Sequence, residues 1–523
     1  MDTTTHARKY YRRAASLGFL MCILVNLCIL SRPTTFSWAD NGVSPPRDIT
    51  PSPREVSPPT VITPLPGEQP RPLSVFVPLP SDELQKLNQA AREELDRSPA
   101  RAKAVTDIHH ANVAKTLFEP HRSILIGTPV IFQVLKDTHV TVVTDRLEQG
   151  LSGTLKWYGH VPEDPNSSSH LVVNETERSL IGHIRMRRVV YEIRPTPSGA
   201  HTIYAIDSTR LPPDRSPHAY GHQSGHLERG PVFAPVDLTL PQIDLMILYT
   251  QEAVTVSEMD TIGSEVCFAV DQVAEALAAS RVQATVRLVH HGRTELAEDD
   301  NIDNFLSKLT DPIKNATGHE LRNKYGADVV SVWVSDKVKQ EDQGLCGKSQ
   351  ILYPPHPGLE TAAYSIVLRS CAIHAERLSF AHELGHVLGA NHDRFYDEAG
   401  NSIEPNWDYV SRERGWRTIM AYDRDDCPDS HCNRIIQWSN PDVAYPANTN
   451  DWTGRPANIT PIGCTDKTGD SSRSGCDGPA NNKLTLDRTA PIVANFRPQA
   501  STLGNVSCGS KEGGTRPPTP PGG

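Results

Sequence analysis

The sequence has no excess of basic residues, no long apolar run beyond its first 30 residues and no cysteine between Cys28 and Cys267. The formal net charge of −10 and the isoelectric point near 6.1 give no basic footprint for DNA or RNA, so we expect no nucleic-acid partner. Beyond the amino-terminal run, no segment is long and apolar enough to span a bilayer. The cysteine-free stretch cannot be stabilised internally by disulfides.

The amino terminus has the features of an export signal. Four basic residues lie within positions 8–13, an apolar run follows at 14–30, and small residues at Ser37 and Ala39 fit the positions that a signal peptidase recognises. We therefore expect a signal peptide over residues 1–39, a secreted, extracellular product and no stable membrane association after cleavage. The alternative is an uncleaved anchor at the cell surface or in the periplasm, because the run is at the short end of a spanning helix.

Cysteine usage also fits export. Two of the ten cysteines lie in the leader, and the other eight lie in the second half of the chain, where an even count in an exported protein indicates disulfides. The sequence cannot choose among the many possible pairings. We expect a local bridge from Cys427 to Cys432 and, less directly, the pairs Cys346–Cys371 and Cys464–Cys476.

Composition divides the chain after the leader into five segments. Prolines crowd residues 40–80 at a density that cannot build a core, which predicts an extended, disordered tether. Residues 81–210 combine alternating apolar residues with turn signals, which predicts a β-rich domain. Residues 211–240 are the expected linker, residues 241–498 a second folded domain, and residues 499–523 a disordered tail rich in Ser, Pro and Gly.

The expected elements give the two domains different fold classes. In the first, we expect a helix at 81–95 and strands at 130–134, 139–144, 170–173, 181–186, 189–194 and 201–207. In the second, a helix at 262–279 is expected among strands at 243–249, 284–290, 328–334 and 363–368. Strands that alternate with helices predict an α/β sheet covered by helices.

The most specific signal is the segment 382–393, which reads His-Glu-Leu-Gly-His-Val-Leu-Gly-Ala-Asn-His-Asp. On a helix, His382 and His386 lie one turn apart on the same face, so both imidazoles can bind one metal ion. Gly389 can adopt the left-handed conformation that ends a helix, which lets the chain turn back and bring in His392 as a third ligand. Three neutral imidazoles leave zinc with its full charge and an open position for water.

Glu383 lies beside the expected metal rather than on it. Zinc lowers the pKa of a bound water, and a neighbouring carboxylate can take the proton as the water attacks a carbonyl. These are the requirements of peptide-bond hydrolysis, with Glu383 as the general base. A structural zinc site would need a fourth protein ligand and no such carboxylate, and the alternative is therefore an exported adhesion or binding protein. Ser379 is the expected N-cap of this helix.

A second mark lies downstream, where residues 418–422 read Thr-Ile-Met-Ala-Tyr. Together with the zinc motif, this run resembles the metzincin clan of zinc endopeptidases, which place a methionine-containing turn beneath the metal. Asp393 after the third histidine is similar to the reprolysin (adamalysin) branch, in which this aspartate supports the turn. With Trp-Ser-Asn-Pro at 438–441, the chain is similar to secreted bacterial peptidyl-Asp metalloendopeptidases. The resemblance implies a twisted mixed sheet with an edge strand within residues 344–352 and an active-site helix.

The resemblance also implies a proenzyme, with residues 81–210 as a propeptide ahead of the catalytic domain at 241–498. Many relatives block the zinc with a propeptide cysteine, and this chain has none in that region. If the first domain inhibits, it must use another ligand, such as an Asp or His, or simply cover the cleft. A folding or binding domain that does not inhibit is the alternative. Tyr422, two residues after Met420, either supports the turn or approaches the zinc.

We predict a secreted zinc endopeptidase that acts on proteins or peptides, with zinc held by His382, His386 and His392. Calcium is a second candidate cofactor at the acidic stretches 299–303 and 423–429. These stretches lack the ligand spacing of a calcium loop, and solvated acidic loops are the alternative.

Specificity is the last expectation. The resemblance implies cleavage on the amino side of Asp, and the aspartate side chain of a substrate would need a cation to offset its desolvation. Arg414, Arg417 and Arg424 flank the predicted methionine turn, and one of them could pair with that carboxylate. Three solvated arginines are the alternative.

Overall fold

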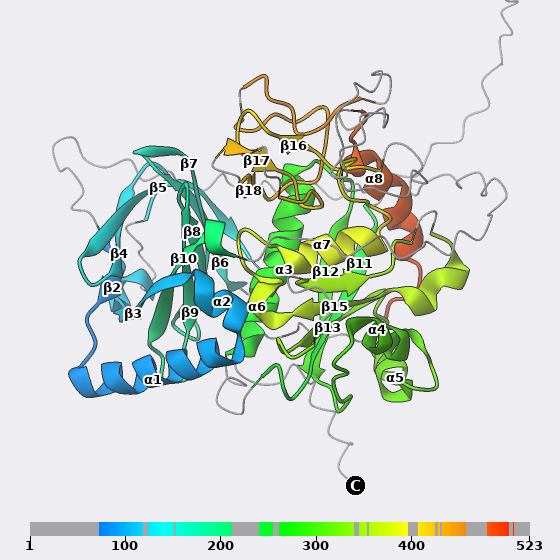
Figure 1. Cartoon of the computed structure of the whole chain (residues 1–523), viewed down its shortest axis with the longest axis horizontal. Helices are drawn as coiled ribbons and strands as arrows, with labels where there is room; N and C mark the ends of the chain where they lie inside the picture. Colours follow the sequence, from blue (N-terminus) through cyan, green and yellow to red (C-terminus); the bar gives the residue numbers. More distant parts are fainter. Residues whose placement is uncertain are drawn as a thin grey trace, which may run out of the picture. The chain divides into compact units, whose positions relative to one another are not determined.

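The computed structural model describes residues 73–118, 124–150, 153–211, 240–254, 261–338, 345–352, 355–395, 406–423, 427–428, 431–447, 449–456, 478–500 and 506. All of them lie in one compact unit, Gln69–Gly523. They form two parts, which we call the β-unit, residues 73–211, and the α/β unit, residues 240–500 (Figure 1). The predicted leader, most of the tether, and nearly all of the linker and tail lie outside the described residues. No helix within the described ranges has the length and apolarity to cross a membrane.

The β-unit is built on a ten-stranded sheet in which all pairings are antiparallel except that of β1 with β4. The strand order is β1-β4-β5-β6-β7-β8-β9-β10-β3-β2. Its elements are β1 (Leu73–Ser74), β2 (Phe76–Val77), α1 (Ser81–Arg97), α2 (Pro99–Ala104), β3 (Val105–Val113), η1 (Lys115–Phe118), β4 (Pro129–Leu135), β5 (Thr138–Gln149), β6 (Leu155–Val161), β7 (Asp164–Asn174), β8 (Ser179–Arg185), β9 (Val189–Pro195), β10 (His201–Asp207) and η3 (Ser208–Arg210).

The predicted helix and all six predicted strands of this region are present, several of them longer than expected. Burial alternates along β4, which explains why its period-two pattern was readable in the sequence. Strands β3 and β6 and the two-residue strands β1 and β2 were missed. Polar residues dominate β3, and Gly159 interrupts the alternating apolar positions of β6, which weakens both signals.

The α/β unit contains a five-stranded sheet in the order β12-β11-β13-β15-β14. Four strands are parallel, and β14 runs antiparallel to β15 at the edge. The strands are β11 (Gln242–Tyr249), β12 (Thr285–Arg293), β13 (Val329–Val334), β14 (Gly347–Ser349) and β15 (Tyr364–Leu368). The helices are α3 (Ile262–Ala279), α4 (Ile302–Thr310), α5 (Ala316–Tyr325), η5 (Pro357–Ala362), α6 (Arg369–Ala372), α7 (Ser379–Val387) and α8 (Asn482–Val493). The predicted mixed α/β architecture is confirmed, and α3 has the predicted bounds.

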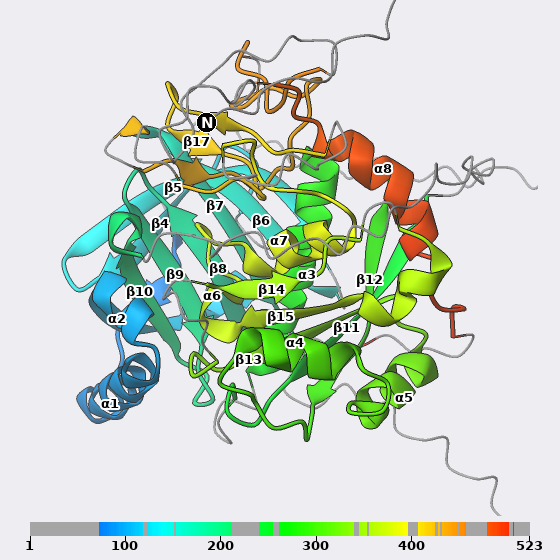
Figure 2. The ribbon, with the colours of Figure 1, turned by 45° about the vertical axis from the view of Figure 1, so that its right-hand side comes forward.

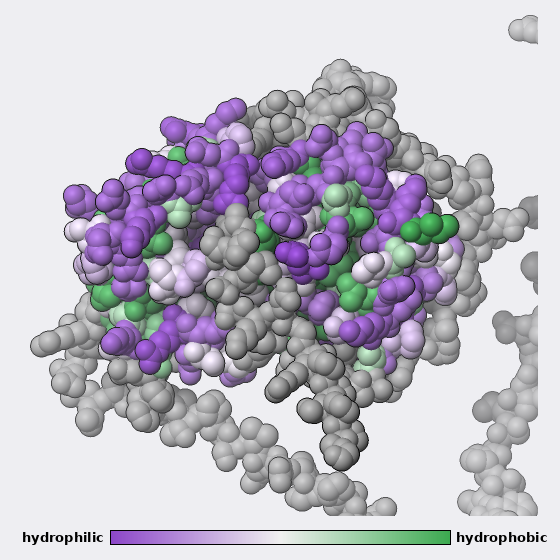
Figure 3. Space-filling view, turned by 90° about the horizontal axis from the view of Figure 1, so that it is seen from below, coloured by the Kyte–Doolittle hydropathy of each residue, from purple (hydrophilic) through white to green (hydrophobic). Residues whose placement is uncertain are grey.

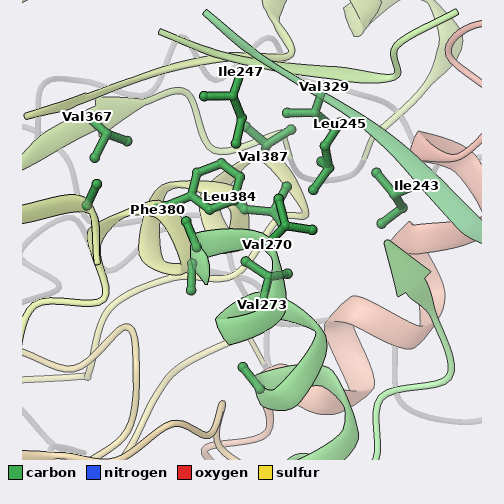
Figure 4. Close-up of a cluster of buried hydrophobic side chains, with 14 of the residues drawn as sticks. Ile243, Leu245, Ile247, Val270, Val273, Val329, Val367, Phe380, Leu384 and Val387 are labelled. Carbon is green, nitrogen blue, oxygen red and sulfur yellow. The ribbon is translucent and has the colours of Figure 1, made fainter. Parts of the chain in front are cut away.

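Both faces of this sheet are buried, because helices cover each of them. Ile243, Leu245 and Ile247 of β11 pack in one cluster with α3 and α7 (Figure 4). Met246 and Leu248 point to the other face, into a second cluster with α4. A strand buried on both sides is a continuous apolar run, which is how 243–249 was recognised in the sequence.

A loop-rich segment after α7 holds three short strands, β16 (Val410–Ser411), β17 (Trp416–Arg417) and β18 (Asn433–Arg434), which lie above α7 in the view of Figure 1. The predicted disulfides Cys346–Cys371 and Cys427–Cys432 are present. Cys464 and Cys476 lie outside the described residues. Figure 2 shows β14 and β15 crossing in front of α3, with α7 beside them.

The face shown in Figure 3 is mainly hydrophilic, and the apolar residues on it lie in separate, small areas. Single exposed apolar residues such as Ile126 and Ile313, which are 70% and 89% exposed, are ordinary for a folded surface.

Candidate metal centre

The helix that carries the zinc motif is α7, and its apolar side anchors it to the sheet. Phe380, Leu384 and Leu388, four residues apart, all lie in the cluster that joins α7 to α3 and β11. The expected N-cap is shifted by one residue. Leu378 adopts a left-handed conformation with φ of 46° at the N-cap, and Ser379 is the first helical residue. The Leu378 carbonyl accepts the His382 N–H at 2.9 Å, which is the first hydrogen bond of the helix, and no side chain caps this helix start.

Three histidine side chains converge at one point. His382 and His386 project from α7, and their ring centroids are 4.8 Å apart. The ring of His392 lies 4.6 Å from that of His386 and 5.2 Å from that of His382. One ligand nitrogen from each of the three histidines lies within 4.8 Å of the other two. Among the described residues, these three side chains are the group that could hold a metal ion. The sequence-predicted ligands are therefore brought together.

Backbone carbonyls fix the ring orientation of the two helical histidines. The His382 Nδ1 atom lies 3.0 Å from the Ile419 carbonyl oxygen, and the His386 Nδ1 atom lies 2.9 Å from that of Ala390. A carbonyl oxygen can only accept, so Nδ1 carries the proton in each ring and donates it. The Nε2 lone pairs are then free to bind a metal. Burial also lowers the pKa of His382 well below its usual value, which keeps this imidazole neutral.

This donor set fits zinc. Three neutral imidazoles with their second nitrogens hydrogen-bonded are a common arrangement for catalytic zinc. In tetrahedral coordination two zinc-bound nitrogens lie about 3.3 Å apart. The Nε2 atoms of His386 and His392 are 2.9 Å apart, so a small side-chain adjustment would accommodate the ion.

The turn after α7 brings His392 to the centre. Gly389 has φ of 84°, the left-handed conformation predicted for it, and its N–H bonds to the His386 carbonyl at 2.8 Å. Asp393 accepts the Tyr422 N–H at 3.0 Å, in agreement with the expectation that this aspartate supports the methionine turn.

Met420 lies fully buried directly beneath α7. A Cβ atom on Gly385 would come within 2.5 Å of the Met420 Sδ atom and 2.9 Å of the Trp438 Nε1 atom. The glycine between the two helical histidines is therefore required for this close approach. Sequence reasoning missed Asp408, whose buried carboxylate accepts N–H groups of Met420, Ala421 and Ser439. Burial raises the pKa of Asp408 to about 6, against the effect of these bonds. An isolated aspartate in a loop carries no sequence signal.

Glu383 lies beside the histidines and contacts the edge strand. The Ser349 hydroxyl of β14 donates to the Glu383 Oε2 atom at 2.6 Å, and it lies 3.0 Å from the Glu383 backbone carbonyl oxygen. Ser349 was expected in the edge strand, but no role for it was predicted. The contact needs the strand and the helix to be packed against each other, which spacing in the sequence cannot indicate.

The Tyr422 side chain contacts His392. Its hydroxyl lies 2.7 Å from the His392 Nε2 atom, and its ring centroid lies 4.2 Å from that of His392. The sequence left open whether this tyrosine supports the turn or approaches the zinc. The structure places its hydroxyl next to a predicted ligand atom.

The arginines predicted near the turn have different surroundings. Arg417 is fully buried, and its guanidinium donates to the carbonyl oxygens of Cys432, Ala421 and Glu376 at 2.9, 3.0 and 3.3 Å. It is therefore neither a solvated residue nor available for substrate. The Arg414 side chain is 70% exposed. Arg424 lies outside the described residues.

In the acidic stretch 299–303, one of the two named as calcium candidates, two aspartates are paired with lysines. Asp299 forms an ion pair with Lys308, and Asp303 forms one with Lys348. Asn301 between them caps α4 by accepting the N–H groups of Asp303 and Asn304. These side chains thus serve the helix start and its cations.

Comparison with known proteins places the α/β unit in a family. Metallo-peptidase family M12, in its reprolysin form, matches residues 239–435. The chain is 26% identical to a peptidyl-Asp metalloendopeptidase of Xanthomonas campestris pv. campestris over 327 residues, which cover 58% of this chain and 73% of that protein. It is 27% identical to a peptidyl-Asp metalloendopeptidase of Stenotrophomonas maltophilia (strain R551-3) over 333 residues, 58% of this chain and 74% of that one.

Among solved structures, the crystal structure of metalloproteinase-II from Bacteroides fragilis is 12% identical and covers 56% of this chain and 83% of that chain, with a TM-score of 0.27. This likeness is too weak to carry an argument. The sequence matches are stronger, and they agree with the zinc motif that the fold assembles. Residues 239–435 are therefore similar to the reprolysin-like metallo-peptidases of family M12, and the chain is a zinc metalloendopeptidase.

Proposed function

We propose that His382, His386 and His392 hold the catalytic zinc and that Glu383 is the general base. The observation that carries this proposal is the convergence of three imidazoles, with Glu383 adjacent to His382 in the helix and its carboxylate held by the Ser349 hydroxyl. A zinc ion bound here would supply a Lewis acid that makes a water nucleophilic at neutral pH and polarises the scissile carbonyl. Glu383 would take the proton from the attacking water and pass it to the leaving amine.

Other residues near the centre would bind the substrate peptide or orient the reacting groups. Strand β14 ends the described sheet order, and an extended peptide could add beside it as a further strand. The Ser349 hydroxyl would hold the Glu383 carboxylate in one orientation. The Tyr422 hydroxyl would donate a hydrogen bond to the oxygen that gains negative charge in the transition state.

Replacing the base and replacing a ligand should have different effects. We expect Glu383→Gln to keep zinc and lose nearly all hydrolysis of casein, because the ligands stay and the base is removed. We expect His392→Ala to lose zinc affinity and hydrolysis together. Metal analysis of both purified variants, run beside the turnover assay, decides between the roles. Near wild-type turnover by Glu383→Gln would refute the mechanism, and a tightly zinc-loaded His392→Ala would place the third ligand elsewhere.

We also propose that the enzyme is secreted and made as a precursor, with a cut in the segment between residues 208 and 241. The basis is the export signal in residues 1–39 and the Pro- and Gly-rich composition of 211–240, which favours proteolysis. Amino-terminal sequencing of the active secreted form should find a start within 208–241. A start at Asp40 would show that the segment is not cut.

Cleavage before Asp is the proposed specificity, because the relatives are named for peptidyl-Asp hydrolysis. The Arg417 guanidinium is committed to carbonyl oxygens, so Arg414 and Arg424 remain as candidate partners of a substrate carboxylate. A profile of bonds cleaved in a proteome-derived peptide library should show Asp after the scissile bond. Large apolar residues in that position would refute the proposed preference for Asp, although the enzyme would still be an endopeptidase. Arg414→Ala and Arg424→Ala then test which arginine sets the preference.

A further inference from the structure

One face of the β-unit sheet is buried against helix α3. Strand β8 is buried at every position. Leu180 and Ile184 pack in the core of the β-unit itself, whereas Ile181 and its cross-strand partner Val172 of β7 pack in the main core of the α/β unit. Figure 1 shows the sheet beside α3. The two units therefore share a continuous apolar core across their contact.

An aromatic cluster lies in the middle of this contact. The Phe268 ring of α3 lies 4.9 Å from the ring of His170 and 6.0 Å from that of His183. Tyr158 also stacks on His170, with ring centroids 4.6 Å apart. These rings come from β6, β7 and β8 and enclose a phenylalanine that a solitary α/β unit would expose to water.

A buried set of ion pairs adjoins the apolar contact. The Arg194 Nη1 atom of β9 lies 3.4 Å from the Glu265 Oε2 atom of α3, and Arg369 Nη2 lies 2.6 Å from Glu265 Oε1. Arg194 Nε also donates to Glu192 at 2.6 Å. These four side chains are between 2% and 12% exposed. Positive and negative side chains of the two units are paired here, so charge pairing fixes how the units fit together while burial of apolar residues favours their association.

The β-unit also holds the segment that leads into the zinc helix. Arg185 of β8 donates to the Arg434 carbonyl oxygen at 2.7 Å and to the Tyr445 hydroxyl at 3.0 Å. Its guanidinium lies 3.7 Å from the Glu376 Oε1 atom, and the Glu376 Oε2 atom accepts the Arg434 N–H at 2.7 Å. Ala375 packs in a cluster otherwise made of β-unit residues such as Tyr204. Residues 374–377, shortly before His382, are therefore fixed partly by the β-unit.

We propose that the β-unit stays bound to the α/β unit when the connecting segment 212–239 is cut, and that it supports the entry to the zinc helix in the working enzyme. After the cut, the β-unit would remain bound to the surface of α3 as a non-covalent subunit derived from the same chain. The inference rests on the proposed cut between residues 208 and 241, since a cut there leaves every contact described above intact.

The first test needs only the wild-type interface. A recognition site for a sequence-specific protease is inserted within 212–239 of the full chain, in the Glu383→Gln background to prevent self-cleavage. After cutting, both pieces should elute as one species in size-exclusion chromatography at pH 7.5 and submicromolar concentration, and separate only on a denaturing gel. Elution of two species would overturn the proposal. Because association is measured in an inactive chain, this result does not depend on whether the wild type is a protease.

Variants test which contacts hold the pieces together. Arg185→Gln and Arg194→Gln each remove one partner of a buried charged contact, and we expect the dissociation constant of the cut complex to rise on the order of 100-fold. Arg146→Gln removes a pair with Glu275 whose arginine is 44% exposed, and should raise it by less than about fivefold. The control Arg293→Gln, paired with Glu295 inside the α/β unit, should leave it unchanged.

The supporting role has its own measurement. In the cut Arg185→Gln complex, backbone amides of residues 374–378 should exchange with solvent at least several-fold faster than in the cut wild-type complex, while those of β13 stay protected. If both arginine variants bind as tightly as the wild type and exchange at 374–378 is unchanged, the ion-paired contact neither holds the pieces together nor supports the zinc helix.

Discussion

The Tyr422 hydroxyl lies 2.7 Å from the His392 Nε2 atom, on the side where that ring would hold the metal. We expect Tyr422→Phe to lower kcat roughly 100-fold with little change in KM, because the lost donor acts on charge that appears only in the transition state. Zinc content should stay near one ion per chain, since the three histidines remain. Peptide turnover with metal analysis measures both, and Tyr325→Phe in α5 is the matched control. An unchanged kcat would assign Tyr422 to the turn alone.

Ser349 has a separate effect, because it contacts the base and not a histidine. Its hydroxyl donates to Glu383 Oε2 at 2.6 Å, so Ser349→Ala should leave the carboxylate free to rotate and lower kcat about tenfold at constant KM. Ser349→Thr keeps a hydroxyl and should restore most of the rate. Steady-state kinetics on the pair gives the answer. If alanine and threonine reduce kcat equally, the residue matters for packing in β14 and does not position Glu383.

At the scale of elements, helix α7 and the methionine turn are fitted to each other through Gly385. Gly385→Ala would bring a Cβ atom within 2.5 Å of the Met420 Sδ atom, and we expect it to lower the free energy of unfolding by about 1–3 kcal/mol. The measurement is denaturant unfolding of the purified chain. Met420→Ala in the Gly385→Ala background should recover part of the loss, which a double-mutant cycle detects. Simple additivity of the two changes would show that helix and turn are not in the predicted contact.

Several elements could be recognised from local pattern alone. The helix Ile262–Ala279 has the predicted bounds, and β11, β13 and β15 differ from their predicted ranges by one residue. These strands are apolar on both faces, so each has a strong local signal. Helices α4, α5 and α8 and the short strands β16 to β18 were missed. Helix α4 has an apolar face at helical spacing, Ile302, Phe305, Leu306 and Leu309, which was overlooked. Helix α5 is largely polar, and β16 to β18 are only two residues long each, so their local signals are weak.

At the scale of the whole molecule, docking of the β-unit should depend on pH. Three buried histidines lie at or near the contact, His170, His183 and His374. Burial lowers the pKa of His183 to about 3, that of His374 to about 4, and that of His170 well below its usual value. Charged groups around them act in both directions: Lys156, Arg146, Arg185, Arg101 and Arg377 oppose protonation, and Glu192 and Glu376 favour it.

Because the pKa values of these histidines are lowered in the docked state, docking should weaken as the pH falls. Where separation exposes the histidines, their pKa values return towards 6.5, so the separated pieces bind more protons below that pH and docking weakens as pH falls from about 6.5 towards 4. Each histidine adds up to about a tenfold loss of affinity per pH unit. Sedimentation of the cut complex across this range measures the slope. His183→Gln should reduce the slope, whereas His160→Gln, on an exposed histidine paired with Asp145, should not. A pH-independent dissociation constant would contradict the prediction.

The zinc-binding chemistry could be predicted from local sequence pattern. The spacing of His382, His386 and His392, the helix signal around them and Gly389 specify a three-imidazole centre through local geometry, because a helical turn and a left-handed glycine are set by neighbouring residues. The local bridge Cys427–Cys432 follows in the same way. Such features involve short separations along the chain, and a motif can encode them completely.

The groups that complete the centre from distant parts of the chain could be identified only once the fold was known. Ser349 meets Glu383 and Asp408 holds the Met420 turn, and neither contact has a sequence pattern. The structure also turned Arg417 from a candidate substrate partner into a buried support. The packing of β8 against α3 also depends on the tertiary structure. A strand that is buried on both faces has the same apolar sequence whether the helix on its second face belongs to its own domain or to another domain. Complementary shape and charge between distant segments determine which helix packs on such a strand, and the local sequence pattern does not contain this information.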